Sequence, residues 1–183
     1  MAIIAHSFGA VEKNVLICSA FESGLGPEEE ASESKETLLQ GLNAEMGLEE
    51  STVDSFLKAN SEKGTLDYNF PKNFKATVIS RETLEDYVGS DGGREAGWIE
   101  LFGQFGDASG VFWVSRIGLN ETGDQALIWV RFESGSNYVS GKFYMLTKLG
   151  ESWAVTELPI PTLIGQSESN KAAMASLIPP RVD

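Results

Sequence analysis

The stretch GVFWVSRIGLNETGDQALIWVRF, residues 110–132, has the most regular pattern in the chain. It spans most of two apolar runs, 111–119 and 125–133, which the polar sequence NETGD separates. Alternation of side chains over such lengths predicts two β-strands joined by a turn. Polar Ser115 and Arg116 interrupt the first run, so they are expected either to perform chemistry or to hold the sheet together.

Two further runs of alternating residues, 138–149 and 152–158, follow after the short turn sequences SGSN and LGES. Short connections force neighbouring strands to pair antiparallel, so the four runs predict a four-stranded meander. The first two strands carry apolar side chains on both faces. Both faces of such a sheet have to be covered, and helices formed by the preceding residues can cover one of them.

Five segments before the sheet have apolar residues close to helical spacing. They are residues 10–23, 36–46, 51–63, 80–89 and 94–106. Ser51 and Ser80 are the expected N-caps of the third and fourth helices, which Gly64 and Gly89 end. A short strand is expected at 73–80.

These patterns predict a single α+β domain over residues 1–183. Its N-terminal helices would pack on a C-terminal antiparallel meander of about four strands, by analogy with cystatin-like or nuclear-transport-factor-like folds. A mobile acidic loop is expected at 24–36, where Gly, Pro, Ser and Glu dominate, and an extended tail from residue 159. The uncovered face of the sheet is left for this tail, a partner chain or a pocket.

The chain has a net charge of −13. Nucleic-acid phosphates and anionic membranes bind clustered Lys and Arg, so neither is expected as a partner. The acidity fits solubility or docking onto a basic partner protein. No stretch approaches the ~20 apolar residues of a membrane span, and the N-terminus lacks the basic start of a signal peptide. The expected location is the cytoplasm, or outside the cell if a signal has been trimmed.

The residues that usually carry catalysis are scarce. His6 is the only histidine and Cys18 the only cysteine, so neither an intrachain disulfide nor a zinc site is expected. The chain lacks a phosphate-binding glycine loop and the spacing of a nucleophile elbow. We therefore expect no catalytic residue, no metal and no cofactor, and a protein that is not an enzyme.

Within the first strand, simple alternation predicts that Trp113 and Ser115 face one way while Arg116 faces the other. An arginine in a strand needs a partner or access to solvent. Two roles are open for Arg116: a structural ion pair with a helix carboxylate, or an anchor for an anionic ligand between sheet and helices. Arg131 is the basic residue that the neighbouring strand offers to such an anchor.

Residues 50–157 resemble a family of small, uncharacterised, mainly bacterial proteins. The shared pattern falls here on Trp98, Phe102, Gly110, Ser115, Arg116, Gly118, Asn120, Gln125, Ala126, Leu127, Gly141, Tyr144, Leu146, Lys148, Gly150 and Trp153. The resemblance implies no established activity, and members of the family are often exported. These residue types are also those that a hairpin needs, so the resemblance favours a structural role for Ser115 and Arg116.

Three functions fit these observations. The first is a non-catalytic, acidic binding or accessory protein that docks a protein partner through its acidic surface and an exposed apolar sheet face. The second is a small-molecule site between sheet and helices, lined by Arg116, Trp113, Trp129 and Tyr144, which could serve a hydrolase or isomerase. The third is a structural protein that self-associates through the sheet.

Overall fold

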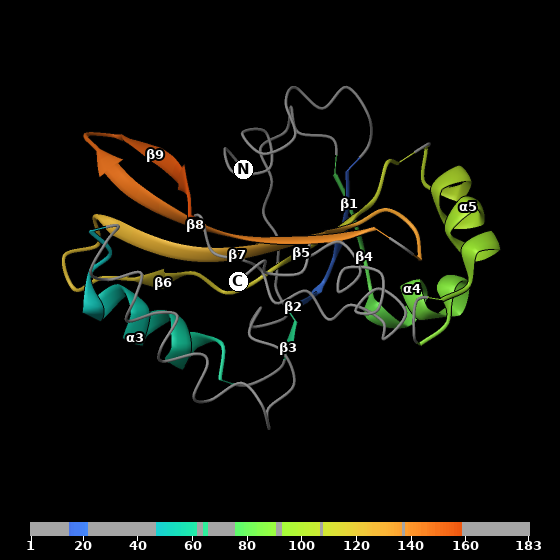
Figure 1. Ribbon diagram of the computed structural model, residues 1–183, viewed down its shortest axis with the longest axis horizontal. Helices are drawn as coiled ribbons and strands as arrows, with labels where there is room; N and C mark the ends of the chain where they lie inside the picture. Colours follow the sequence, from blue (N-terminus) through green and yellow to red (C-terminus); the bar gives the residue numbers. More distant parts are fainter. Residues whose placement is uncertain are drawn as a thin grey trace, which may run out of the picture.

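The computed structural model describes residues 15–21, 47–61, 64–65, 76–90, 93–106, 108–136 and 138–158. They form a mixed α/β structure with three helices and a mostly antiparallel sheet (Figure 1). The helices are α3 (Glu50–Ala59), α4 (Arg81–Val88) and α5 (Glu95–Gln104). The strands are β1 (Val15–Cys18), β2 (Ala20–Phe21), β3 (Gly64–Thr65), β4 (Ala76–Ile79), β5 (Val111–Val114), β6 (Gly118–Leu119), β7 (Gln125–Glu133), β8 (Val139–Leu149) and β9 (Ser152–Glu157).

The main sheet has seven strands in the order β4-β1-β5-β7-β8-β9, with β6 paired to β7 beside this path. Strands β5, β7, β8 and β9 pair antiparallel in sequence order, so the predicted meander is confirmed. The bounds of β7 agree with the predicted strand at 125–133. The predicted strand at 111–119 is wrong in its middle, because it divides into β5 and β6 and leaves residues 115–117 outside both.

The start of the described chain is a strand and not the helix predicted for residues 10–23. Val15–Cys18 forms β1, which pairs parallel with both β4 and β5. All four residues of β1 are at most 2% exposed, because neighbouring strands flank it and side chains pack on both faces. The prediction of helices before strands is therefore corrected: strands β1 and β4 precede the meander and extend it into a mixed sheet.

Helices α4 and α3 form where the sequence predicts them, and their ends can be compared with the predicted caps. Ser80 caps α4, accepting a hydrogen bond from Thr83 N at 3.0 Å, and Gly89 ends it with a positive φ. The third predicted helix forms as α3, but Glu49 and not Ser51 is its N-cap. The predictions for residues 36–46, for the loop at 24–36 and for the tail from 159 lie outside the described residues.

All three described helices pack on one side of the sheet, which we call face A. Its strand residues include Leu16, Val111, Trp113, Leu127 and Trp129. Helix α3 lies against β6 and β7, while α4 and α5 pack together at the opposite end of the sheet (Figure 1). None of these helices is long and apolar enough to span a membrane.

The opposite side of the sheet, face B, carries a second apolar cluster. Its buried members are Val15, Ile17, Phe112, Ile128, Val130 and Tyr144. Each of them is at most 5% exposed. The expectation of an exposed apolar sheet face is therefore wrong for these residues.

Candidate functional site

Ser115 lies where the first strand of the predicted hairpin breaks. Its backbone N–H donates to Trp129 O at 2.9 Å, as a strand residue would. In return, Trp129 N donates to the Ser115 side-chain Oγ at 2.9 Å, in the position that a backbone carbonyl would occupy in a ladder. The hydroxyl also donates to Arg116 O at 3.0 Å. Ser115 thus keeps the pairing with β7 while its own carbonyl leaves the sheet, which ends β5.

Arg116 joins the sheet to the C-terminal end of α3. Its backbone N–H donates to Asn60 Oδ1 at 2.8 Å, and Asn60 Nδ2 donates back to Arg116 O at 3.0 Å. The guanidinium Nη1 donates to Ala59 O at 3.1 Å. A cation at the C-terminal carbonyls of a helix is favourable, because the helix dipole is negative there. Arg116 therefore contacts a helix that packs on face A, whereas simple alternation predicted that its side chain would face away from Trp113.

The N-terminal end of α3 is held by Gln125, the first residue of β7. Gln125 Oε1 accepts from Glu49 N at 2.7 Å and from Thr52 Oγ1 at 2.9 Å. Gln125 Nε2 donates to Gly47 O at 3.0 Å. This one buried amide satisfies backbone groups that a helix N-terminus would otherwise leave unpaired.

The turn before β7 adds a second contact with the same helix end. Asn120 Nδ2 donates to Glu49 Oε2 at 3.0 Å and to Asp124 Oδ1 at 2.7 Å. Asn120 Oδ1 accepts from the backbone N–H groups of Asp124 and Gln125, each at 3.0 Å. Hydrogen bonds from Asn120 and Thr122 hold the pKa of the Asp124 carboxyl below its usual value. We call the four residues that hold the two ends of α3 the α3 clamp: Asn60, Arg116, Asn120 and Gln125.

Face A also carries Glu133, the last residue of β7 and the only charged residue among the buried residues that the structure describes. Glu133 is 6% exposed; its carboxylate accepts from Trp113 Nε1 at 3.2 Å and forms an ion pair with Arg131. The guanidinium groups of Arg81 and Arg131 lie 5.6 Å and 5.7 Å from the Trp113 ring centroid. The ion pair with Arg131 and the hydrogen bond from Trp113 compensate the cost of burying the charge of Glu133, and the two cation–π contacts hold the guanidinium groups at the Trp113 ring.

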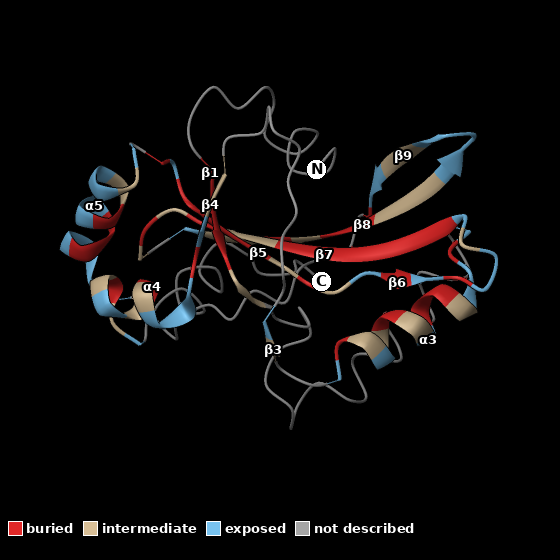
Figure 2. Cartoon of the chain, turned by 180° about the vertical axis from the view of Figure 1, so that it is seen from behind, coloured by how far each residue is buried: buried red, intermediate tan, exposed pale blue. Residues whose placement is uncertain are grey.

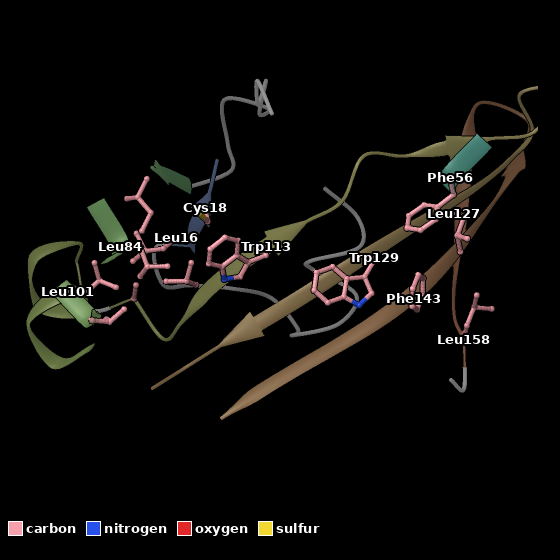
Figure 3. Packing of buried hydrophobic residues seen from close by; sticks show 14 of the residues in the cluster. Leu16, Cys18, Phe56, Leu84, Leu101, Trp113, Leu127, Trp129, Phe143 and Leu158 are labelled. Atoms are coloured by element: carbon pink, nitrogen blue, oxygen red, sulfur yellow. The ribbon is translucent and has the colours of Figure 1, made fainter. Parts of the chain in front are cut away.

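The four residues predicted to line one pocket occupy three different places. Trp113 and Trp129 share face A, where Figure 3 shows them in the apolar cluster with Phe143. Tyr144 belongs to face B, and Arg116 binds the end of α3. Trp129 is 5% exposed, and its Nε1–H has no hydrogen-bond partner among the described residues, although a buried indole usually finds one.

Strand β9 forms an edge of the sheet that the sequence reading did not single out. Leu158 N donates to Phe143 O at 2.9 Å, directly opposite in register. Backbone groups of an antiparallel strand alternate between its two sides, so those of Trp153, Val155 and Glu157 point away from β8. Within the described chain, β9 pairs with β8 alone, and Figure 2 colours it intermediate and exposed while most of β7 is buried. The position of β9 as the last strand of the predicted meander is the sequence feature that indicates an edge strand.

A charged pair lies at one end of this edge. Lys142 Nζ is 2.8 Å from Glu157 Oε1, and the Glu157 carboxylate raises the pKa of the Lys142 ammonium. Among the described residues, no three His, Cys, Asp or Glu side chains come close enough together to hold a metal ion.

Comparisons with protein-family models, with curated proteins and with solved structures gave no match to this chain. The function has therefore to be inferred from the residues themselves.

Proposed function

We propose that this protein is a non-catalytic binding protein that docks a protein partner along the edge of β9. The observation that carries the proposal is the outward row of backbone groups at Trp153, Val155 and Glu157. Unpaired strand edges are templates for a further strand, and an extended segment of another protein can supply it.

The use of the other conspicuous residues supports this choice. Ser115 and Arg116, which the sequence marks as candidates for chemistry, instead hold β5 to β7 and the sheet to α3. Asn120 and Gln125 hold the other end of α3. Face A is occupied by helices, and the side chains of face B are buried. Within the described chain the main sheet ends in two edge strands, β4 and β9, and β9 is the longer, with 6 residues against 4.

The net charge of −13 adds a preference for the partner. An acidic protein attracts basic segments over a range of about 8–10 Å at physiological salt. A segment of another protein on this edge would therefore be rich in Lys or Arg and should bind more weakly as salt is added, whereas pairing with a second acidic copy should strengthen as salt screens the repulsion.

The test is a quantitative affinity capture that compares the wild-type chain with Val155→Pro. Proline at this position removes an N–H that points away from β8, which an edge strand tolerates. The matched control is Ile99→Gln, which removes an apolar side chain that is 71% exposed on α5. We expect a partner that the control retains and Val155→Pro loses. A partner that both variants retain, or one lost only with Ile99→Gln, would place the docking surface elsewhere.

A second candidate function is the binding of a small molecule in the middle of face A. The unpartnered Nε1–H of Trp129 favours it, because a ligand with a hydrogen-bond acceptor would satisfy this buried donor. The guanidinium groups around Trp113 would favour an anionic ligand. A thermal-shift screen of small carboxylates and phosphates tests this function. A hit has to lose its effect in Trp129→Phe, whose ring keeps the packing but carries no N–H.

A further inference from the structure

We infer that the occupant of the β9 edge is the same edge of a second copy of this chain. The two copies would pair antiparallel about a two-fold axis at Val155, joining their sheets into one. This inference rests on the proposed function, because it names the partner of the edge described above.

The register follows from the direction of the backbone groups. An added antiparallel strand has to place its own outward residues opposite Trp153, Val155 and Glu157. The ladder between β8 and β9 runs from Ser152 to the hydrogen bond of Leu158, and Val155 is the centre of this segment. A two-fold axis at Val155 therefore pairs the whole segment with its copy. A two-fold axis also closes the assembly at two chains, with no further β9 edge exposed.

Side chains oppose one another favourably in this register. Val155 would lie opposite Val155 of the second copy, and Trp153 opposite Glu157 of the second copy. Apolar and donor–acceptor pairs across strands stabilise a sheet, and the indole N–H of Trp153 can donate to the carboxylate. Glu157 already has Lys142 beside it, so its charge stays compensated when the edge is covered.

Other registers lose these advantages. An axis at Glu157 sets two carboxylates directly opposite each other, which is unfavourable. An axis at Ala154 brings Glu151 of the turn opposite Glu157. An axis at Trp153 is limited by the turn at Gly150 and Glu151, so few residues can pair. An axis at Thr156 sets the charged Glu157 opposite the apolar Val155 and leaves Trp153 without a described residue opposite it. The charge and length of the edge together therefore favour the axis at Val155.

The test is sedimentation velocity on the full chain at about 100 μM, where a dimer with a dissociation constant near 10 μM is mostly assembled. We expect a wild-type dimer. Trp153→Glu sets a carboxylate opposite Glu157 of the second copy twice per dimer, so it should weaken association at least about tenfold. The matched control Trp153→Lys sets opposite charges together and should remain a dimer.

The stability of each variant separates this effect from misfolding. Within one chain, residue 153 lies opposite Lys148 of β8. The Trp153→Glu chain should therefore be the more stable of the two in thermal unfolding, while it is the weaker dimer. Variants that both dissociate, or both remain dimers, would overturn the register.

The capture experiment distinguishes failure of the inference from failure of the proposed function. A monomeric wild type that loses a heterologous partner in Val155→Pro overturns self-pairing but supports edge docking. A monomer with no edge-dependent partner overturns both. A dimer that Val155→Pro dissociates supports both, with the second copy as the partner.

Discussion

The two helical units on face A are attached to the same sheet by different interactions. Helix α3 is held at both ends by buried side-chain amides: Asn60 binds the chain at Arg116, and Gln125 binds the first turn. The α4–α5 pair is held mainly by apolar packing, with Leu84 and Leu101 in the core, and by exposed hydrogen bonds from Ser136 to Glu95. Polar contacts fix the position and direction of a helix, whereas apolar contacts let it adjust.

Each unit has one close backbone contact at a glycine: Gly118 of β6 lies against α3, and Gly97 of α5 lies against α4. Replacing these glycines should have the largest effects. A Cβ on Gly118 would lie 2.3 Å from Phe56 N of α3, and one on Gly97 would lie 1.9 Å from Tyr87 O of α4. Because the clamp prevents α3 from moving away, we expect Gly118→Ala to cost about 3–5 kcal/mol and Gly97→Ala about 2–3 kcal/mol. Urea denaturation measures both.

Gly103→Ala is the control for these substitutions. Gly103 lies in α5, and an added Cβ meets nothing within 4 Å. The change should stabilise the protein by up to about 1 kcal/mol through helix propensity. If Gly97→Ala proves more costly than Gly118→Ala, the α4–α5 unit is the more rigidly held, and the difference between the units is reversed.

Removing one end of the clamp should have the next largest effect. Asn60→Ala removes the side-chain acceptor of Arg116 N and one of the two side-chain donors to Arg116 O in a partly buried site, so we expect a loss of about 2–3 kcal/mol. Asn60→Asp keeps the acceptor for Arg116 N but loses the donor, and should fall between the wild type and Asn60→Ala. Glu95→Ala, at the other unit, should cost much less because its partners are exposed. Equal losses at the two sites would show that the clamp is not what distinguishes α3.

The sequence predicts those parts of the fold that depend on local signals. Strand 125–133 and the helix that Ser80 caps depend on local signals, and both were predicted correctly. The spacing of Val11, Val15 and Cys18 predicts a helix over this segment, but Val15–Cys18 is a strand whose four consecutive apolar residues have no period of their own. A central strand buried on both faces and a buried turn of helix give the same sequence pattern.

The site was harder to predict than the fold for a related reason. Arg116 and Asn60 are 56 positions apart, and nothing in either segment announces the other. Alternation predicts one strand through Ser115, but the Ser115 side chain takes the place of a backbone group and ends the strand. Trp129 and Tyr144 were correctly recognised as strand residues, but the register between β7 and β8 places them on opposite faces. Register is a tertiary property that pairs of distant residues determine.

The guanidinium of Arg116 should contribute less than the amide of Asn60. Its Nη1 bond to Ala59 O is only partly buried, so Arg116→Met should cost about 1 kcal/mol and leave the fold intact. The backbone bonds to Asn60 do not depend on the side chain and should persist. Thermal unfolding and near-ultraviolet circular dichroism measure both effects. An unfolded Arg116→Met protein would instead make the guanidinium the principal link between α3 and the sheet.

The smallest effects are expected from the carboxylates, one at each unit, whose pKa values are lowered. Hydrogen bonds from Ser136 lower the pKa of Glu95 beside α5, and those from Asn120 and Thr122 lower that of Asp124 beside α3. A carboxyl whose pKa is lower in the folded state binds its proton more readily in the unfolded chain. Its contribution to stability is therefore present above the ordinary pKa, near pH 4, and is lost as the pH falls through the folded value.

Glu95→Gln and Asp124→Asn should each lower the stability at pH 7 to 8, where the carboxylate contributes, and should flatten the loss of stability below about pH 4, where that contribution is absent. Urea denaturation at a series of pH values measures the slopes.

Because Asp124 shares Asn120 with the N-terminal end of α3, Asp124→Asn should also weaken the coupling between Asn120 and Glu49. Glu95 has no such connection to the clamp, so a double substitution of Glu95 and Asn60 should be additive, whereas Asp124 and Asn120 should not be. Coupling between Glu95 and Asn60 would mean that the two helical units respond to each other through the sheet.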